Sequence, residues 1–255
     1  MNKSAVTSKV PEVTLAFWVI KILATTVGET GGDAVTMTMR LGYAVGSFIF
    51  LAFFFVTVTA QVRAKSYRPF LYWADIVATT TAGTTMADFA DRSLGIGYAG
   101  GSLILFALLM ASLAVWKLAV GNVSVNNITT AKAEIFYWVT ILFSNTLGTA
   151  LGDWLADTGG FGYEGGALVF SGALALIAVA YYHTKLSHTL LFWMAFILTR
   201  PLGATMGDIL TKPLSYGGLH LSRIDSSLAI LAVMVACILL MPQRAGGHPS
   251  HSAKE

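Results

Sequence analysis

One pattern recurs four times along the chain and restricts the fold more than any other feature. A tryptophan is followed ten residues later by glycine and fifteen residues later by aspartate. The residues are Trp18, Trp73, Trp138 and Trp193, then Gly28, Gly83, Gly148 and Gly203, then Asp33, Asp88, Asp153 and Asp208. The tryptophans are 55, 65 and 55 residues apart, so equivalent positions in the two halves are 120 residues apart. The pattern indicates a unit that was duplicated twice.

Each copy also contains two apolar windows of about 20 residues, enough to cross roughly 30 Å of hydrocarbon. Hydrophobic residues make up 55% of the chain, which has only 16 Lys and Arg and 13 Asp and Glu, and its mean hydropathy is +0.69. A water-soluble domain could not cover its surface with so few charges. We therefore expect an all-α membrane protein with eight transmembrane helices, over residues 13–33, 42–62, 70–88, 98–120, 134–153, 163–183, 188–208 and 226–241.

The eight predicted helices divide into two homologous halves, residues 13–120 and 134–241, with two copies of the two-helix unit in each. Because each unit has an even number of crossings, the four copies should be oriented in parallel around an axis along the membrane normal. The first helices of the units are then expected to surround a centre, with the second helices outside them. The tryptophans are predicted to lie in an aromatic belt at one membrane interface.

Basic residues in the connecting segments predict the orientation in the membrane. The termini and the loops on their side carry ten Lys and Arg residues, whereas the opposite loops carry four, Arg40, Arg92, Lys212 and Arg223. This difference favours cytoplasmic termini, formed by residues 1–12 and 242–255. The second of these segments is polar, contains His248 and His251, and is predicted to be disordered.

The repeated aspartates end the first helix of each unit, about 22 Å beyond the tryptophan at 1.5 Å per residue. Carboxylates within membrane segments are costly and usually mark ion pathways. The alternative interpretation is that each one caps the following turn. In the first copy, Glu29 lies four residues before Asp33 and shares its helix face. The candidate metal ligands are therefore Glu29, Asp33, Asp88, Asp153 and Asp208.

Hydroxyl groups and one base accompany these acids. The supporting residues are Thr26, Thr30, Thr84, Thr85 and Arg200. Carboxylate, hydroxyl and carbonyl oxygens are ligands for Ca²⁺, Mg²⁺ or Mn²⁺ rather than for thiolate-preferring metals. The glycines from Gly28 to Gly32 offer a further alternative, in which the helix unwinds locally and frees carbonyl oxygens for a cation or water.

The charges inside the predicted helices favour a cation as the ligand. Six acids are present there, but only two bases, Lys21 and Arg200. Arg200 replaces the threonine or asparagine of the other copies and is expected to act as an internal counter-charge. Lys21 is expected to pair with Asp75 near the cytoplasmic ends of the helices. Asp91 and Asp157 are expected to form an external vestibule.

Catalytic and nucleotide-binding motifs are absent from the sequence. There is no G-x-x-x-x-G-K-[ST] loop for ATP, no H-E-x-x-H and no G-x-S-x-G. We therefore expect no enzyme activity, no catalytic residues and no cofactor. The single cysteine, Cys237, excludes a disulfide scaffold, and the unclustered net charge of +3 argues against nucleic-acid binding.

The four glycine–aspartate hairpins resemble a family of small, uncharacterised bacterial inner-membrane proteins over most of the chain. More distantly, GETGGD at 28–33, with GTTMAD, GTALGD and GATMGD, is similar to the E-x-G-D-[KR]-[ST] signature of the GDT1-type manganese and calcium exchangers. An extra residue after Glu29, and Ala34 in place of the basic residue, depart from that signature. The resemblance implies a multi-pass protein of the bacterial inner membrane and favours export of manganese or calcium.

These observations favour a secondary transporter of divalent metal cations, with Mn²⁺ or Ca²⁺ as cargo and protons as the coupling ion for export. One alternative is a proton- or sodium-coupled carrier of a small organic cation. Another is a membrane scaffold or sensor partner that transports nothing. The expected partners are the lipid bilayer and the cation, without nucleic acid, and a homo-oligomer is left open.

Overall fold

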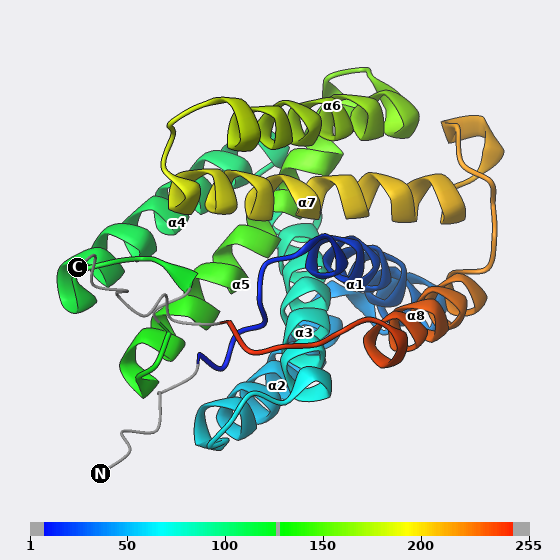
Figure 1. Cartoon of the computed structure of the whole chain (residues 1–255). Helices are drawn as coiled ribbons and strands as arrows, with labels where there is room; N and C mark the ends of the chain where they lie inside the picture. Colours follow the sequence, from blue (N-terminus) through cyan, green and yellow to red (C-terminus); the bar gives the residue numbers. More distant parts are fainter. Residues whose placement is uncertain (1–7, 126–127, 247–255) are drawn as a thin grey trace, which may run out of the picture.

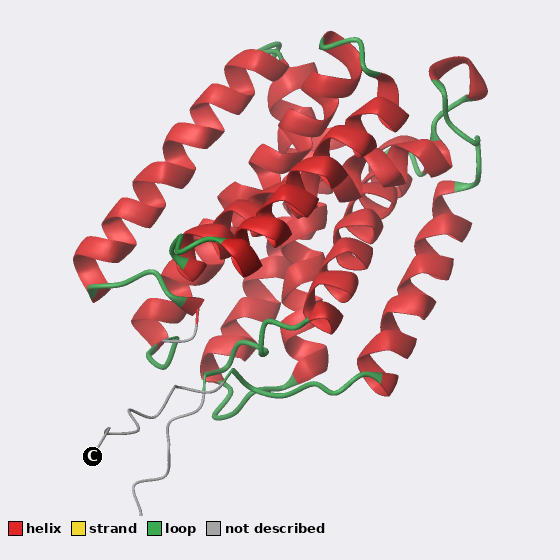
Figure 2. Cartoon of the chain, turned by 45° about the horizontal axis from the view of Figure 1, so that its top comes forward, coloured by secondary structure: helices red, strands yellow, loops and turns green. Residues whose placement is uncertain are grey.

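The computed structural model of the chain describes residues 8–125 and 128–246. Within these residues the chain forms eight α-helices joined by loops and short turns, and no β-strand (Figures 1 and 2). The helices are α1 (Leu15–Asp33), α2 (Gly42–Arg63), α3 (Pro69–Asp88), α4 (Tyr98–Val120), α5 (Ala131–Asp153), α6 (Gly162–His183), α7 (His188–Thr211) and α8 (Arg223–Leu240). Their bounds follow the eight predicted apolar windows closely.

Four helices form a closed ring, in which α1 packs against α3, α3 against α5, α5 against α7, and α7 against α1. We call these the inner helices and the other four the outer helices. Each outer helix packs on the inner helix of the next unit: α2 on α3, α4 on α5, α6 on α7, and α8 on α1 (Figure 1). The predicted arrangement, with the first helix of every unit around a centre, is therefore confirmed.

The four units are parallel, because the segments that should share one side meet at one end of the ring. The hydroxyl of Ser8 lies 3.5 Å from the carbonyl oxygens of Val125 and Ile128. The Lys9 ammonium donates to the carbonyl of Val62 at 3.0 Å and lies 2.5 Å from the Glu134 carboxylate. These contacts join the segment before α1 to the last turn of α2, the α4–α5 connection and the first turn of α5.

Residues after α8 return to the same end of the ring. Pro11 and Ala245 form an isolated antiparallel bridge, and the Glu12 amide donates to the carbonyl of Arg244 at 2.9 Å (Figure 1). The predicted tail begins at 242, and its first residues, up to 246, are held by these contacts. The remainder of that tail, including His248 and His251, lies outside the described residues.

Large apolar side chains cover the outer helices, as expected for contact with lipid. Phe48 on α2 is 76% exposed and Leu168 on α6 is 75% exposed. Within the part of the chain that the structure describes, six helices can cross a membrane by length and composition: α2, α4, α5, α6, α7 and α8. The protein is thus a multi-pass membrane protein by these criteria. That α1 and α3 also cross the membrane stays a prediction. Lys21, Glu29 and Asp33 reduce the hydropathy of α1, and a run of threonines reduces that of α3.

The predicted interfacial belt of tryptophans is wrong. Trp73, Trp138 and Trp193 are buried, and Trp18 is half-buried. Trp73 stacks at an angle on Phe17, and Trp138 stacks on Tyr72. A belt residue lies at the boundary between protein, lipid and water, whereas these rings fill the end of the helix ring nearest the termini. The repeated tryptophan is a core residue that closes this end.

Three of the four inner helices continue into a π-helical turn directly after the repeated aspartate. These turns are η1 (Ala34–Thr38), η2 (Phe89–Ser93) and η4 (Trp154–Thr158). In the fourth copy α7 continues as an α-helix to Thr211, and the 3₁₀ turn η5 (Leu214–Tyr216) follows. Single π turns are found frequently at functional sites. The fourth unit therefore differs from the others beside its carboxylate.

Candidate cation site

Equivalent repeat positions form successive levels along the ring. The aspartate level consists of Asp33, Asp88, Asp153 and Asp208. Four residues earlier, the next level consists of Glu29, Thr84, Thr149 and Ala204. Four residues earlier again, a third level consists of Thr25, Thr80, Asn145 and Arg200. Every one of these side chains is buried, so polar groups occupy the interior of the ring over three successive turns.

The repeated glycines let the inner helices approach closely enough to build these levels. A Cβ added to Gly28 would overlap Thr80, and one added to Gly203 would overlap Thr25. Gly83 meets Asn145, and Gly148 meets Arg200, in the same way. Each glycine therefore contacts the third-level residue of the next inner helix around the ring. Close packing between neighbouring inner helices therefore explains why glycine recurs at this position in all four units.

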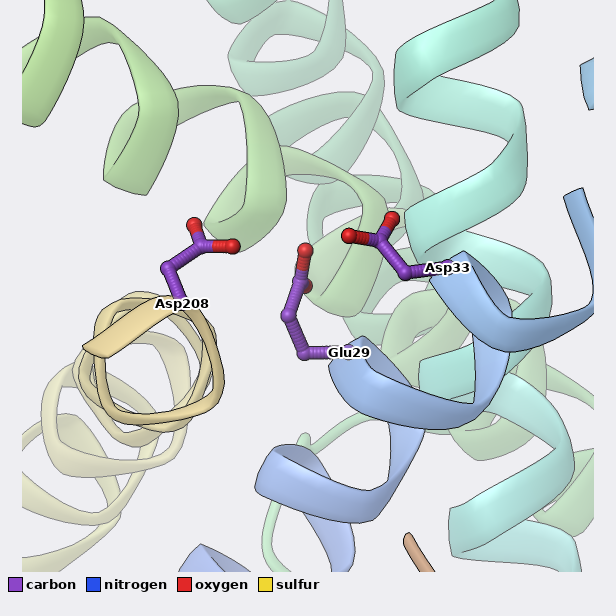
Figure 3. A group of neighbouring side chains, drawn as sticks. All are labelled: Glu29, Asp33 and Asp208. Atoms are coloured by element: carbon purple, nitrogen blue, oxygen red, sulfur yellow. The ribbon is translucent and has the colours of Figure 1, made fainter. Parts of the chain in front are cut away.

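Three of the five predicted ligands meet at one place. Glu29 and Asp33 come from α1 and Asp208 comes from α7, and one carboxylate oxygen of each lies within 4.8 Å of the others. Figure 3 shows the three carboxyl groups pointing toward one another across the α1–α7 contact. All three side chains are buried. We call Glu29, Asp33 and Asp208 the acidic cluster.

The other two predicted ligands are held together by a base instead. The Arg92 guanidinium lies 3.0 Å from the Asp88 carboxylate and 3.0 Å from that of Asp153. Asp88 ends α3 and Asp153 ends α5, so this bridge joins the second and third units. Asp88 and Asp153 do not belong to the acidic cluster.

A second base bridges the acidic cluster itself. The Lys212 ammonium lies 3.3 Å from the Asp33 carboxylate and 3.2 Å from that of Asp208. The Nε atom of Arg223, at the start of α8, lies 3.5 Å from Asp33. Sequence reasoning placed these bases and Arg92 in external loops and so missed them as site residues. Arg92 and Lys212 each follow an aspartate by four residues, and that spacing was the available signal.

Arg200 lies inside the ring and contacts the acidic cluster from the other side. Its Nη2 atom is 2.9 Å from the Glu29 carboxylate and 2.6 Å from the Thr149 hydroxyl, and it also contacts the Thr84 hydroxyl. The Thr84 hydroxyl in turn lies 3.3 Å from Glu29. The expected internal counter-charge is therefore positioned to neutralise Glu29, which the other copies lack.

The remaining supporting threonines serve their own helices. The hydroxyls of Thr26, Thr30 and Thr85 each donate to a carbonyl oxygen three or four residues earlier in the same helix. Thr30 also accepts a hydrogen bond from the Ser227 hydroxyl on α8 at 2.7 Å. Of the predicted supporting residues, only Thr84 and Arg200 contact the acidic cluster among the hydrogen bonds of the described residues.

Two local expectations are wrong. Lys21 does not pair with Asp75: its ammonium lies 3.4 Å from the amide oxygen of Asn145 and 4.2 Å from the centre of the Phe196 ring. Although α3 packs against α1, the Lys21 side chain extends instead across the ring to Asn145 on α5 and to Phe196 on α7. The segment from Gly28 to Gly32 does not unwind, because α1 continues unbroken to Asp33.

A cavity of about 690 Å³ opens beside the aspartate level. Arg92 and Lys212 both line it, together with Asp157 and three tyrosines, Tyr98, Tyr163 and Tyr216. Asp157 accepts hydrogen bonds from Tyr98 and Tyr163, both at 3.3 Å. Asp157 thus lines this cavity, and its position on the external side stays a prediction. Asp91 packs instead against Gly101 on α4.

The acidic cluster offers hard oxygen donors, which suit a divalent cation of the Ca²⁺, Mg²⁺ or Mn²⁺ type. The Oδ1 atom of Asp33 is buried without a hydrogen-bond partner among the described residues. Lys212 holds a positive charge between Asp33 and Asp208, so the cluster already accommodates one cationic group.

No curated protein matches the chain significantly, and no solved structure does. These comparisons therefore give the likeness to GDT1-type exchangers no support. A family described as a Repeat of Unknown Function, DUF347, matches residues 16–67, 71–121, 136–187 and 191–242. The four matches coincide with the four two-helix units and confirm the internal repeat. Because the matches cover most of the sequence, this chain belongs to the DUF347 family.

Proposed function

We propose that this protein is a secondary transporter of divalent metal cations. The observation that carries the proposal is the convergence of Glu29, Asp33 and Asp208, three buried carboxylates on two packed inner helices. Buried acids in a membrane protein are costly and by default mark an ion pathway. Mn²⁺ and Ca²⁺ are the favoured cargo, in line with the GDT1-like sequence motif.

The surroundings of the cluster support entry of an ion from one side. The cavity of about 690 Å³ reaches Lys212, which contacts Asp33 and Asp208. At the opposite end of the ring, buried aromatic side chains such as Trp73 and Trp138 close the centre. An ion that enters the cavity therefore reaches the carboxylates before any apolar barrier. Transport then requires this aromatic end to open.

Protons are the proposed coupling ion, with export as the direction. A carboxylate that releases a cation can take a proton in its place, which links the two fluxes. We place the protein in the bacterial inner membrane with both termini in the cytoplasm. The cavity then opens toward the outside, because it lies at the ring end opposite the termini.

A carrier of a small organic cation is the second candidate, and the cavity favours it. A volume of about 690 Å³ is far larger than a bare ion needs. Tyr98, Tyr163 and Tyr216 supply aromatic faces, which attract ammonium groups, and Asp157 supplies a negative charge. An organic cation would bind in the cavity, whereas a metal ion would bind at the acidic cluster.

Cation-dependent thermal stabilisation of the purified protein tests the proposal. A ligand at 100 times its dissociation constant adds about 2.7 kcal/mol to the stability. Mn²⁺ or Ca²⁺ should raise the melting temperature of the wild type, and Glu29→Gln should reduce that rise. Glu164→Gln, at an exposed acid on α6, is the matched control and should behave as the wild type does.

Flux through liposomes that contain the protein completes the test. Uptake of Mn²⁺ or Ca²⁺ should depend on the protein, respond to an imposed pH gradient, and fall in Glu29→Gln. Stabilisation and flux with organic cations alone would favour the second candidate. No stabilisation and no flux with either class would leave a scaffold or sensor partner.

A further inference from the structure

Lys212 occupies the position that a bound cation would take. Its ammonium lies 3.3 Å from Asp33 and 3.2 Å from Asp208, between the two helices that carry the acidic cluster. An ammonium group is a compact point charge with three donors, close to a metal ion in the way it neutralises carboxylates. A metal ion bound to Oδ2 of Asp33 and Oδ1 of Asp208 would compete with Lys212 for these oxygens.

Arg92 shows that this arrangement recurs with one difference. In the second and fourth copies a base follows the aspartate by four residues and bridges it to the aspartate of the next copy. Arg92 joins Asp88 to Asp153, with Thr84 and Thr149 at the level below. Lys212 joins Asp208 to Asp33, with Glu29 at that level. A third carboxylate is therefore present at the Lys212 bridge.

Lys212 is also placed so that its ammonium group can move away from the two carboxylates. It follows the last residue of α7 and precedes Pro213, and its side chain is 12% exposed, whereas those of Asp33 and Asp208 are almost fully buried. It lines the cavity of about 690 Å³, which has room for a withdrawn side chain. Its flexible four-carbon chain can swing while the backbone of α7 stays in place.

We infer that Lys212 is a built-in counter-ion that competes with the transported cation for Asp33 and Asp208. The inference rests on the proposed function and adds the regulation of its site. When cargo arrives, the ammonium withdraws into the cavity; when cargo leaves, the ammonium returns. Arg223 and Arg200 contact Asp33 and Glu29, so these two acids keep a counter-charge when Lys212 withdraws.

Removal of the ammonium tests the inference through cation affinity. Lys212→Gln should bind Mn²⁺ or Ca²⁺ about 10- to 100-fold more tightly than the wild type, the usual range for coupling between two sites. Release of the cation should slow in proportion. The control is Arg92→Gln, which removes the equivalent base from the bridge without Glu29 and should change affinity far less. Equal gains in both variants, or no gain in Lys212→Gln, would overturn the inference.

Chemical labelling of the wild type supplies a second readout, should Lys212→Gln fail to fold. Cation binding should expose the Lys212 amine and increase its rate of modification by an amine-reactive reagent. Lys185, exposed in the α6–α7 connection, is the internal reference and should not change. If the wild-type protein binds cations and the labelling of Lys212 does not change, the inference about Lys212 is refuted and the proposed function is not. Wild-type protein that binds no cation would refute the proposed function.

Discussion

The Arg200 guanidinium lies 2.9 Å from the Glu29 carboxylate, and both side chains are buried inside the ring. Each of these residues is an exception among the four copies. Glu29 is the one acid at its level, and Arg200 is the one base at its level. The two exceptions come from the first and fourth units, which are far apart in sequence and adjacent in the ring. The departure of the four copies from one another at these positions is thus a neutralised ion pair and not an isolated charge.

This pair gives the first prediction. Arg200→Thr leaves Glu29 buried without its counter-charge, and breaking a buried pair costs about 3–5 kcal/mol of stability. The double variant Glu29→Gln with Arg200→Thr should recover most of that loss, because neither charge remains. Thermal unfolding in detergent measures both. If the double variant is no more stable than Arg200→Thr, the arginine acts through packing rather than charge.

Folded Arg200→Thr protein should also bind cations more tightly and release them more slowly. The acidic cluster becomes more negative when the guanidinium is removed, so a divalent cation gains attraction. Equilibrium binding of Mn²⁺ and the rate of its release check this expectation. Unchanged affinity and turnover would mean that Arg200 does not act on the cation.

The repeat, the helices and the ring could all be predicted from the sequence. Equal spacings from Trp18 to Asp33 and from Trp193 to Asp208 define one unit, and an even number of crossings makes the units parallel. Packing of α7 against α1 closes the ring. That closure places Asp33 and Asp208 at one level, because equivalent positions on adjacent parallel helices share a level.

The partners of the charges could not be predicted, because they depend on contacts between units. Lys21 and Asp75 occupy neighbouring repeat positions, yet the ring places Lys21 beside Asn145 on α5. Arg92 and Lys212 follow the ends of predicted helices. A count of basic residues in the loops treats such residues as exposed to water. In the structure each of these bases bridges carboxylates that belong to two different units. Spacing within one unit carries no information about such bridges.

The close contacts of the repeated glycines give a prediction about packing. A Cβ at Gly83 would lie 2.9 Å from the backbone nitrogen of Thr146 and 3.0 Å from the carbonyl carbon of Asn145. Neither atom can move without shifting α5, so Gly83→Ala should lose about 1–3 kcal/mol. Apart from its chain neighbours and the nearby backbone of its own helix, Gly172 on α6 has no atom of the described residues within 4 Å of such a Cβ. Gly172→Ala should therefore be neutral or stabilising, by up to about 1 kcal/mol.

Thermal unfolding of the two alanine variants, measured side by side, decides this point. Equal stability of Gly83→Ala and Gly172→Ala would show that the inner helices are not in the close contact described above. A selective loss in Gly83→Ala would support the cyclic glycine packing.

Orientation in the membrane gives a prediction about access. The loop charges predict that the cavity end faces outward and that the termini lie in the cytoplasm. In a background with Cys237 replaced, single cysteines at Leu94 and Ser215 should react with a membrane-impermeant reagent added to whole cells. Cysteines at Lys65 and Lys185 should react only after the membrane is opened. The reverse pattern would invert the topology and leave the ring intact.

The acidic cluster gives the sharpest prediction, because the structure changes the expected order of its members. From sequence, Asp33 and Asp88 are expected to matter most, followed by Asp153 and Asp208. In the structure Asp208 joins Asp33 and Glu29, whereas Asp88 lies beside Arg92.

Asp33→Asn and Asp208→Asn should therefore abolish Mn²⁺-dependent stabilisation and transport while the protein still folds. Glu29→Gln should weaken binding, because Asp33 and Asp208 remain as ligands. Asp88→Asn and Asp153→Asn should keep cation-dependent stabilisation, because neither side chain belongs to the cluster. Thermal shift and liposome flux at pH 6–8, with Glu164→Gln as control, give the ranking. Wild-type behaviour of both Asp33→Asn and Asp208→Asn would show that these acids only hold Lys212 and Arg223, and the transport site would then lie elsewhere.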